Sequence, residues 1–536
     1  MPTKYIVVVG SLLSGLGKGI VTASIGKILS MYGFRVRPLK FDGYLNYDCG
    51  TMNPYRHGEV FVLDDKGEVD MDFGTYERFL DVNMSTDFSM TGGKLFGEII
   101  MKERRGDFLG RDVQIIPDMV GMILDKIEGV AAKEKLDVML IEVGGTVGDI
   151  ENGYFVEAMR QLALKQKTVF IDVTYVPELT TVGEQKTKPT QIALRGLMQN
   201  GIRPDFIFCR SERPINKSAR RKIAMFANLD ESRVLDDHDA GNIYSMPLSF
   251  IEQGIDSLLL KDLGMDGAAL DRGKLDGLRK YAEAIEHNAG REVNVAIVGK
   301  YIDLHDSYAS VKEALVHAGV ANGAKLRLNW IESEELEGID GRGVAVKLAG
   351  NDCVLVPGGF GKRGIEGMIN AIRYARENKL PFLGLCLGMQ LMTIEYARNA
   401  AHLEGANSSE FDNGAPHKVI DIMEDQKSIE EKGGTMRLGS WPAKLGEGTR
   451  ARAAYGADTT HERHRHRYEF NNDYRERLVG AGLVISATTP DGNIVEIVEW
   501  KDHFGVGTQA HPELKSRPER PAPLFAAFIR SAMGSE

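Results

Sequence analysis

The stretch YIVVVGSLLSGLGKGI, residues 5–20, indicates the fold of the N-terminal half. It opens on a short apolar run, passes into a glycine-rich turn and continues into a helical pattern. A run without polar alternation is typical of a strand buried on both faces of a sheet. The turn therefore joins a strand to a helix, and the free N–H groups and dipole of that helix would attract an anion such as a phosphate.

The turn SGLGKG resembles a phosphate-binding loop but lacks one of its usual parts. Lys18 is followed by Gly19, where such loops carry a serine or threonine whose hydroxyl helps to bind Mg²⁺. If the loop binds a nucleoside triphosphate, another oxygen ligand must hold the metal. A glycine-rich turn with a surface lysine is the alternative interpretation.

Further apolar runs recur along the chain and lead into loops marked by Gly or Pro. They occupy residues 136–145, 167–176, 203–209, 293–301, 351–360 and 381–388. Helical patterns separate many of them, which predicts an α/β fold built from parallel sheets covered by helices. We predict two doubly wound parallel-sheet domains, 1–265 and 293–536, joined by a linker at 266–292.

Composition excludes several classes of protein. The 536 residues, 43% apolar and 26% charged, suit a globular protein too long for a single core. A net charge of −10 without a long basic block argues against a nucleic-acid partner. No apolar run approaches the ~20 residues of a membrane helix, and the start lacks the features of a signal peptide. The scattered single cysteines favour a cytoplasmic protein.

Carboxylates that follow predicted strands are candidates to replace the missing hydroxyl. Asp70 and Asp72 stand in EVDMDFGTYERF, and Glu142 ends an apolar strand. Ligands of open α/β sheets bind at the carboxyl ends of strands, and Mg²⁺ takes one or two protein carboxylates with phosphate and water. The alternative is a solvated acidic turn, which is less favoured for Glu142 because burying a carboxylate without a partner is costly.

Lysines follow two other predicted strands. Lys40 ends FRVRPLK, and Lys186 and Lys188 lie in the proline-stiffened GEQKTKPTQ. These cations could bind one or two polyphosphates at the same sheet edge. An ordinary surface lysine and a solvated basic loop are the alternatives.

In the C-terminal half, PFLGLCLGMQ predicts a nucleophile elbow. Cys386 lies between an apolar strand and a helix, with Gly384 and Gly388 each two residues away. Small neighbours allow the sharp turn, and the helix N-terminus favours a thiolate. An inert core cysteine is the alternative, and it is the interpretation that we prefer for Cys353.

A general base for this thiol stands near the C-terminus. GTQAHPE supplies His511, and Glu513 two residues later can orient its imidazole on an extended segment. The N–H groups of Gly359 and Leu387 could form an oxyanion hole.

The cluster HERHRHRYEF invites a metal site, which we disfavour. His461, His464 and His466 are interleaved with arginines, and no carboxylate or cysteine ligand stands at proper spacing. The arginines are better suited to bind a carboxylate, because a guanidinium matches it with two hydrogen bonds. A solvated basic strand is the alternative. The arginines are Arg463, Arg465 and Arg467.

Taken in order, the motifs resemble those of the CTP synthase family over nearly the whole chain. EVGGTVGDIE and GEQKTKPTQ are the most specific, and they stand with SGLGKGI, DMDFGTYERF, PGGFGKRG, GLCLGMQ, RHRYEFN and HPE. The resemblance implies an N-terminal amidoligase domain and a C-terminal class I glutamine amidotransferase domain. It implies that ATP phosphorylates UTP at its 4-oxygen and that ammonia from glutamine then gives CTP in pyrimidine biosynthesis.

The resemblance also implies roles for individual residues. Cys386, His511 and Glu513 would form the catalytic triad, and Asp72 and Glu142 would hold Mg²⁺. ATP would contact Gly15, Leu16, Gly17, Lys18, Gly19, Ile20, Lys40, Asp72, His238, Asp239 and Ala240. UTP or CTP would contact Ser14, Asp149, Ile150, Glu151, Lys186, Thr187, Lys188, Pro189, Thr190, Gln191 and Lys222. Glutamine would contact Gly359, Leu387, Gly388, Met389, Gln390, Glu410 and Arg467.

The family further implies CTP as a feedback inhibitor, GTP as an activator, and a homotetramer that can form filaments. Ala309 stands where some members have a lysine that is associated with activation by GTP. Asp118 and Ile192 also replace residues that are commonly histidine in the family. Arg363 and Arg437, in contrast, stand in motifs that match those of the family.

Three other functions fit part of the pattern. One is an amidoligase that amidates a carboxylate on a large cofactor precursor. The second is a nucleotide-dependent switch or filament protein whose second half only binds glutamine, and the third is a glutamyl peptidase.

Overall fold

The computed structural model describes residues 2–179, 183–287, 290–302, 304–423 and 433–534. Contacts divide the chain into two compact units, one of residues 1–48 and 75–286 and one of residues 49–74 and 287–536. The proposed domain bounds stay a prediction, and residues 288–289 of the predicted linker lie outside the described residues. Among the helices of the described ranges, none combines the length and apolar character needed to cross a membrane.

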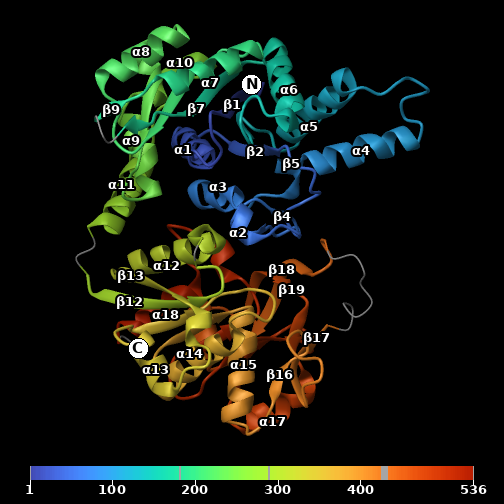
Figure 1. The fold of residues 1–536 in the computed structure, drawn as a ribbon, viewed down its shortest axis with the longest axis vertical. Coiled ribbons are helices and arrows are strands. Elements are labelled where there is room, and N and C mark those ends of the chain that lie inside the picture. The colour runs from blue at the N-terminus through green and yellow to red at the C-terminus, as the bar shows by residue number, and fades with distance from the viewer. Residues whose placement is uncertain (1, 180–182, 288–289, 303, 424–432, 535–536) are drawn as a thin grey trace. The chain divides into compact units, whose positions relative to one another are not determined.

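The first unit is built on a seven-stranded parallel sheet, ordered β11-β10-β7-β1-β6-β2-β5 (Figure 1). Its strands are β1 (Lys4–Ser11), β2 (Val36–Asp42), β5 (Ser89–Thr91), β6 (Val138–Val143), β7 (Thr168–Tyr175), β10 (Phe206–Ser211) and β11 (Val234–His238). Every residue of β6 is buried, as the apolar runs predict for a sheet covered on both faces.

Helices connect these strands and follow the last of them. They are α1 (Lys18–Met31), α3 (Asp72–Leu80), α4 (Gly92–Arg104), α5 (Val120–Lys133), α6 (Gly153–Lys165), α7 (Lys188–Gln199), α8 (Lys217–Ala227), α9 (Met246–Glu252), α10 (Ile255–Leu263) and α11 (Arg272–Glu286). A short hairpin of β8 (Glu178–Leu179) and β9 (Glu184–Gln185) follows β7.

The second unit contains a nine-stranded sheet, ordered β13-β12-β14-β15-β23-β22-β21-β18-β19. Its strands are β12 (Glu292–Gly299), β13 (Lys325–Glu332), β14 (Cys353–Val356), β15 (Phe382–Leu385), β18 (Arg437–Leu445), β19 (Thr459–His466), β21 (Val484–Thr488), β22 (Val495–Glu499) and β23 (Gly505–Thr508). The sheet is parallel from β13 to β23 and antiparallel from β23 to β19. The α/β prediction is confirmed, and the antiparallel extension adds to it.

Two apolar clusters cover the two faces of this sheet. Val354 and Val356 of β14 pack in one cluster, whereas Cys353 and Leu355 pack in the other, because side chains alternate along a strand. The helices are α12 (Ala309–Ala321), α13 (Gly341–Leu348), α14 (Ile365–Glu377), α15 (Leu387–Asn399), α16 (Arg450–Tyr455), α17 (Arg475–Gly480) and α18 (Pro523–Ala532).

Smaller elements complete the second unit. A three-stranded sheet consists of β16 (Ala406–Ser408), β17 (His417–Ile422) and β20 (Tyr468–Phe470). Residues 49–74 contribute α2 (Pro54–His57) and the strand pair β3 (Phe61–Val62) and β4 (Glu68–Val69). This segment comes from within the predicted N-terminal domain, yet its contacts place it in the unit with residues 287–536.

Candidate active sites

The predicted phosphate loop joins β1 to α1. Gly15 and Gly17 have φ values of 72° and 86°, in the left-handed region that glycine adopts at little cost. Lys18 begins α1, and its Nζ donates a hydrogen bond of 2.8 Å to the carbonyl oxygen of Gly145. A Cβ atom at Gly10 would lie 2.8 Å from that Nζ, so the glycine leaves room for the lysine at the end of β1.

Lys40 and Glu142 face each other where β2 and β6 end. The two residues are partners in the parallel ladder, and Nζ of Lys40 lies 3.7 Å from Oε1 of Glu142. The hydroxyl of Tyr76 donates to the other carboxylate oxygen. Glu142 is 1% exposed and Lys40 is 4% exposed. Since a buried charge is costly unless it is paired, these partners explain how a carboxylate ends an apolar strand.

The predicted metal ligands are Asp72 and Glu142. Asp72 begins α3, and its backbone N–H donates to Oδ1 of Asp70 over 2.9 Å. Within the described ranges, no group of three or more His, Cys, Asp or Glu side chains is arranged to hold a metal ion. Carboxylate oxygens are nevertheless the donors that Mg²⁺ prefers, and this ion is commonly completed by phosphate and water. The donor chemistry fits an ion that binds together with a nucleotide.

The other predicted nucleotide contacts follow the C-terminal ends of neighbouring parallel strands. Residues 149–151 follow β6, residues 186–191 follow β7, Lys222 lies on α8 after β10, and His238 ends β11. Parallel strands end at one edge of their sheet, so the topology gathers these segments along that edge. Residues 238–240 line a cavity whose other walls come from α9 and α11.

Hydrogen bonds shape the segment 186–191. The hydroxyl of Thr190 donates to the carbonyl oxygen of Tyr175 at the end of β7, over 2.9 Å. The amide of Gln191 donates to the hydroxyl of Thr187, over 3.1 Å. Lys188 and Pro189 begin α7, where a proline fits because the first N–H groups of a helix have no intrahelical partner.

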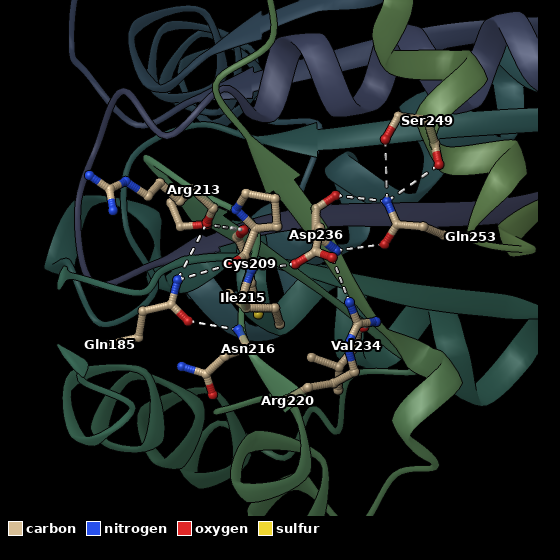
Figure 2. Close-up of polar contacts among 12 residues, drawn as sticks. Gln185, Cys209, Arg213, Ile215, Asn216, Arg220, Val234, Asp236, Ser249 and Gln253 are labelled. Atoms are coloured by element: carbon tan, nitrogen blue, oxygen red, sulfur yellow. Dashed lines mark hydrogen bonds and ion pairs between the residues drawn. The ribbon is translucent and has the colours of Figure 1, made fainter. Parts of the chain in front are cut away.

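A polar network shown in Figure 2 supports the start of this segment. Oε1 of Gln185 accepts a hydrogen bond of 2.8 Å from the N–H of Asn216, and its Nε2 donates to the carbonyl oxygen of Pro214 over 3.1 Å. The carboxylate of Asp236 accepts from the N–H of Ile215 over 2.8 Å and from the guanidinium of Arg220 over 2.6 Å.

Gln253 extends this network to the region of helix α9. Its side-chain oxygen accepts from the N–H of Asp236 over 2.7 Å, and its amide donates to the carbonyl oxygen of Asp236 over 3.0 Å. Asp236 lies two residues before His238. The network therefore connects the segments that follow β7 and β10 with strand β11 and the end of α9.

The C-terminal unit has the predicted elbow. Cys386 lies between β15 and α15 with φ 51° and ψ −98°, a backbone conformation that is rare for residues other than glycine. A Cβ atom at Gly388 would lie 2.2 Å from the carbonyl oxygen of Val356, and one at Gly384 would lie 2.6 Å from the backbone of Gly388. The two glycines thus permit the close approach of strand and helix that the turn requires.

His511 and Glu513 lie beside this cysteine because β15 and β23 are parallel neighbours. The N–H of Cys386 donates to the carbonyl oxygen of Thr508, the last residue of β23, over 2.7 Å. Nδ1 of His511 lies 2.7 Å from Oε1 of Glu513. Burial opposes the charge on His511, but Glu513 and Cys386 outweigh it and raise the pKa of the imidazole. The arrangement favours an imidazolium beside the thiol group of Cys386.

A cavity opens at this group. Gly358, Gly359 and Phe360 of the loop after β14 line it together with Cys386 and His511. Its other lining residues are Pro54, Glu59, Val60, Val62, Tyr301, Ser307, Tyr308, Val311, Arg465, Glu513 and Leu514. The segment 54–62 is therefore part of the wall, and the motifs of the C-terminal half gave no sign of it.

The predicted glutamine contacts do not all line this cavity. Gly359 lies in its wall, and Gln390 is buried with its amide 3.0 Å from the carbonyl oxygen of Tyr468. Glu410 accepts a hydrogen bond of 2.9 Å from the N–H of Gly361, and Arg467 donates to the hydroxyl of Thr435 over 2.9 Å. Neither Glu410 nor Arg467 is one of the described residues that line the cavity.

Sequence reasoning also missed Gln509. Its Nε2 lies 3.5 Å from Sγ of Cys386, and the side chain is buried. A signal was available, because Gln509 stands two residues before His511 and side chains at that spacing share a face on extended chain.

Two of the three arginines of HERHRHRYEF bind carboxylates of residues 49–74. Nε of Arg463 lies 2.7 Å from Asp64, and Nε of Arg465 lies 2.8 Å from Glu68. Arg463 is 0% exposed, so the alternative of a solvated basic strand is wrong for it. His464 and His466 are buried, and burial together with the charge of Arg437 lowers the pKa of both.

Comparison with known proteins gives matches to both halves. A family model described as CTP synthase N-terminus matches residues 4–265, and one described as glutamine amidotransferase class-I matches residues 303–531. The chain is 51% identical over 534 residues to a CTP synthase of Caldanaerobacter subterraneus subsp. tengcongensis. The alignment covers 99% of this chain and 98% of the relative. It is 51% identical over 537 residues to a CTP synthase of Carboxydothermus hydrogenoformans, with 99% of each chain covered.

A solved structure resembles the C-terminal half. It is the glutaminase domain of Trypanosoma brucei CTPS with bound acivicin, which is 37% identical and has a TM-score of 0.43. The alignment covers 46% of this chain and 95% of that one.

Proposed function

Since this chain belongs to the CTP synthase family of glutamine-dependent ligases, we propose that its two charged sites divide the reaction between them. The chain makes CTP with ammonia taken from glutamine. The first site activates UTP with ATP, and the second releases ammonia. One observation carries this division: Cys386 and His511 lie together in one contact unit, whereas Lys40 and Glu142 lie together in the other.

Membership in this family disfavours the three other functions that fit the motifs. Matches to both halves favour a ligase that consumes the ammonia over a peptidase or a module that only binds glutamine. The N-terminal match favours a pyrimidine nucleotide over a carboxylate as the acceptor.

In the second site, the thiolate of Cys386 attacks the side-chain amide carbon of glutamine and forms a tetrahedral oxyanion. The N–H groups of Gly359 and Leu387 stabilise that charge. The imidazolium of His511 gives its proton to the departing nitrogen, so that ammonia leaves and a thioester remains. Glu513 holds Nδ1 of His511, which keeps Nε2 directed at the reacting atoms.

The thioester is then hydrolysed. His511, now neutral, takes a proton from a water molecule that attacks the carbonyl carbon. The C–S bond breaks, glutamate leaves, and the thiolate of Cys386 is restored beside the imidazolium.

In the first site, the 4-oxygen of UTP attacks the γ-phosphorus of ATP and ADP departs. Ammonia then adds to C4 of the phosphorylated pyrimidine, and inorganic phosphate leaves with a proton lost from nitrogen. Oxide is a poor leaving group and phosphate a good one, which is why the phosphorylation is needed. Lys18 and Lys40 offset the charge on the phosphoryl group, so this site acts chiefly by positioning and electrostatic stabilisation.

The family resemblance implies Asp72 and Glu142 as ligands of Mg²⁺, and the ion would neutralise phosphate charge. We assign the nucleotides to the segments gathered at the edge of the parallel sheet. ATP lies along residues 15–20 and 238–240, and UTP or CTP lies along residues 149–151 and 186–191.

Regulation and assembly follow from the family resemblance alone. We propose CTP as a feedback inhibitor, GTP as an activator weakened by Ala309, and a homotetramer that can form filaments. Exposed Ile150 and Ile192, 94% and 57% accessible, are available to contact ligands or other subunits.

The test is to incubate the protein with UTP, ATP, Mg²⁺ and a nitrogen donor and to measure CTP. We expect Cys386→Ala to abolish synthesis from glutamine and to leave synthesis from ammonium salt within about twofold of the unsubstituted protein, because the thiol acts only on the amide. Cys353→Ala is the matched control, since Cys353 is also buried in the second unit. It should retain synthesis from both donors.

Equal loss of both activities in folded Cys386→Ala would contradict the division into two sites. Absence of CTP from the unsubstituted protein with either donor would contradict the function itself.

A further inference from the structure

Lys300 is a buried lysine that the mechanism above does not use. It follows β12 directly and is 1% exposed. An ammonium group removed from water is costly unless hydrogen bonds or charges compensate it. The surroundings of its Nζ therefore indicate why a lysine stands here.

The Nζ of Lys300 is bound to the loop that carries the proposed oxyanion donor. It donates to the carbonyl oxygen of Phe360 over 3.2 Å and to the carbonyl oxygen of Gly361. These residues directly follow Gly359, and a Cβ atom at Gly359 would lie 3.7 Å from Cδ of Lys300. The lysine thus supports the loop through its ammonium group, and its stem lies close to Gly359.

Glu410 holds the same loop from another element. Its Oε1 accepts a hydrogen bond of 2.9 Å from the N–H of Gly361, whose carbonyl oxygen is bound by Lys300. Both polar groups of Gly361 are therefore engaged by charged side chains. Burial raises the pKa of Glu410, and the Gly361 N–H and the charge of Lys300 act against that rise.

The backbone of Lys300 is itself held in place. Its N–H lies 3.2 Å from the hydroxyl of Tyr308, and its carbonyl oxygen accepts a hydrogen bond of 2.6 Å from the hydroxyl of Tyr55. The guanidinium of Arg363 donates to the same carbonyl oxygen. A lysine fixed at its backbone and bonded at its tip can impose a geometry on the loop it touches.

We propose that Lys300 is a positioning residue for glutamine hydrolysis, which holds the loop 358–361 so that the N–H of Gly359 meets the oxyanion. The proposal rests on the function assigned above to Cys386 and Gly359. Lys300 acts through the loop, because it is not among the described residues that line the cavity at Cys386.

The test compares Lys300→Met with the unsubstituted protein. Methionine keeps a flexible apolar stem and removes the ammonium. Loss of one oxyanion donor costs about 100- to 1000-fold in kcat, so we expect a displaced donor to lower the kcat of glutamine hydrolysis about 10- to 100-fold. The KM for glutamine should change less than about threefold.

Two further measurements separate positioning from general damage. Alkylation of Cys386 by iodoacetamide needs the thiolate but no oxyanion hole, so its rate should stay within about twofold. Synthesis of CTP from ammonium salt should stay within about twofold because it bypasses the second site. Lys362→Met, an exposed lysine next to the same loop, is the matched control and should retain full glutamine hydrolysis.

An unchanged kcat in Lys300→Met would overturn the proposal, and so would an equal fall in kcat and in alkylation rate. Either result is distinguishable from failure of the assigned function, since that failure would appear as glutamine-dependent synthesis that survives Cys386→Ala.

Discussion

Single residues carry the chemistry of both sites, and tight turns of the backbone hold them in position. The elbow illustrates this, since Cys386 keeps a positive φ that the packing of β14, β15 and α15 must maintain. Strain of this kind costs about 1–3 kcal/mol and persists only where the surrounding structure compensates for it. The glycines on either side are therefore needed for this turn.

We predict that Gly388→Ala disrupts this turn. The added Cβ would lie 2.2 Å from the carbonyl oxygen of Val356, and backbone on both sides must shift to relieve the clash. Overpacking of this type costs about 1–3 kcal/mol. Thermal unfolding should show the lower stability, and glutamine hydrolysis should fall at least about tenfold because the displaced helix carries the N–H of Leu387.

Gly480→Ala is the matched control, because nothing lies within 4 Å of a Cβ atom there. The packing argument fails if Gly388→Ala unfolds at the same temperature as Gly480→Ala and hydrolyses glutamine normally.

Lys18 is the corresponding residue of the first site. We expect Lys18→Ala to lower CTP synthesis about 100- to 1000-fold from either nitrogen donor, because a cation that stabilises transition-state charge is lost. Glutamine hydrolysis measured alone should persist. Coupled assays with glutamine and with ammonium salt give the comparison.

Lys165→Ala, an exposed lysine on α6, should retain both activities. Ammonia-dependent synthesis at the normal rate in Lys18→Ala would argue against the phosphate site.

At the scale of elements, the parallel sheet of the first unit brings the loops after its strands to one edge, and a polar network holds some of these loops in place. Asp236 is the centre of that network, since its carboxylate and its backbone bind the segments after β10 and the side chain of Gln253 (Figure 2). Gln185 bonds to the same segment just before Lys186. A substitution of Asp236 should therefore alter the binding of UTP at the proposed pyrimidine site.

We predict that Asp236→Ala destabilises the first unit by about 1–3 kcal/mol, because the N–H of Ile215 and the guanidinium of Arg220 lose an acceptor. The KM for UTP should rise more than that for glutamine. Calorimetry measures the first effect, and steady-state kinetics with each substrate varied in turn measure the second.

Glu231→Ala changes an exposed carboxylate in the same unit and should shift stability by less than about 0.5 kcal/mol. If Asp236→Ala behaved like Glu231→Ala in both measurements, the network would have no supporting role.

At the scale of the whole molecule, stability depends on pH through buried histidines of opposite kinds. Burial and Arg437 lower the pKa of His466 to about 3, below its ordinary value of 6.5. Below pH 6.5, His466 therefore binds a proton in the unfolded chain but stays neutral in the folded chain. The free energy of unfolding consequently falls as the pH falls toward 3. His511, whose pKa is raised, contributes stability that is present below pH 6.5 and is lost at high pH.

We predict that His466→Gln reduces the loss of stability between about pH 6.5 and about pH 5. One such group contributes at most about 1.4 kcal/mol per pH unit, so the melting temperatures of variant and unsubstituted protein should converge as the pH falls. Thermal melts at several pH values measure this.

His461→Gln, at an exposed position on the same strand, is the matched control for the loss of a histidine. A constant difference in melting temperature between His466→Gln and the unsubstituted protein across this range would show that His466 does not titrate as the burial argument requires.

Local sequence patterns were sufficient to predict the α/β fold and to indicate which candidate site residues follow the strands. Apolar runs without alternation mark buried parallel strands, and such strands end at one edge, so residues that follow them can be grouped without coordinates. The elbow at Cys386 could be predicted for the same reason, because a strand, two glycines and a helix are neighbours in sequence. The catalytic roles of these residues stay predictions.

Contacts between distant segments required the folded structure. Asp64 and Arg463 are 399 residues apart, and no periodicity indicated that residues 49–74 would pack with the C-terminal sheet and line the cavity at Cys386. The bonds from Lys300 to the loop 358–361 bridge 60 and 61 residues in the same way. Hydrophobic patterns record which face of an element is buried but not which partner buries it, because burial is non-directional and many partners satisfy it equally.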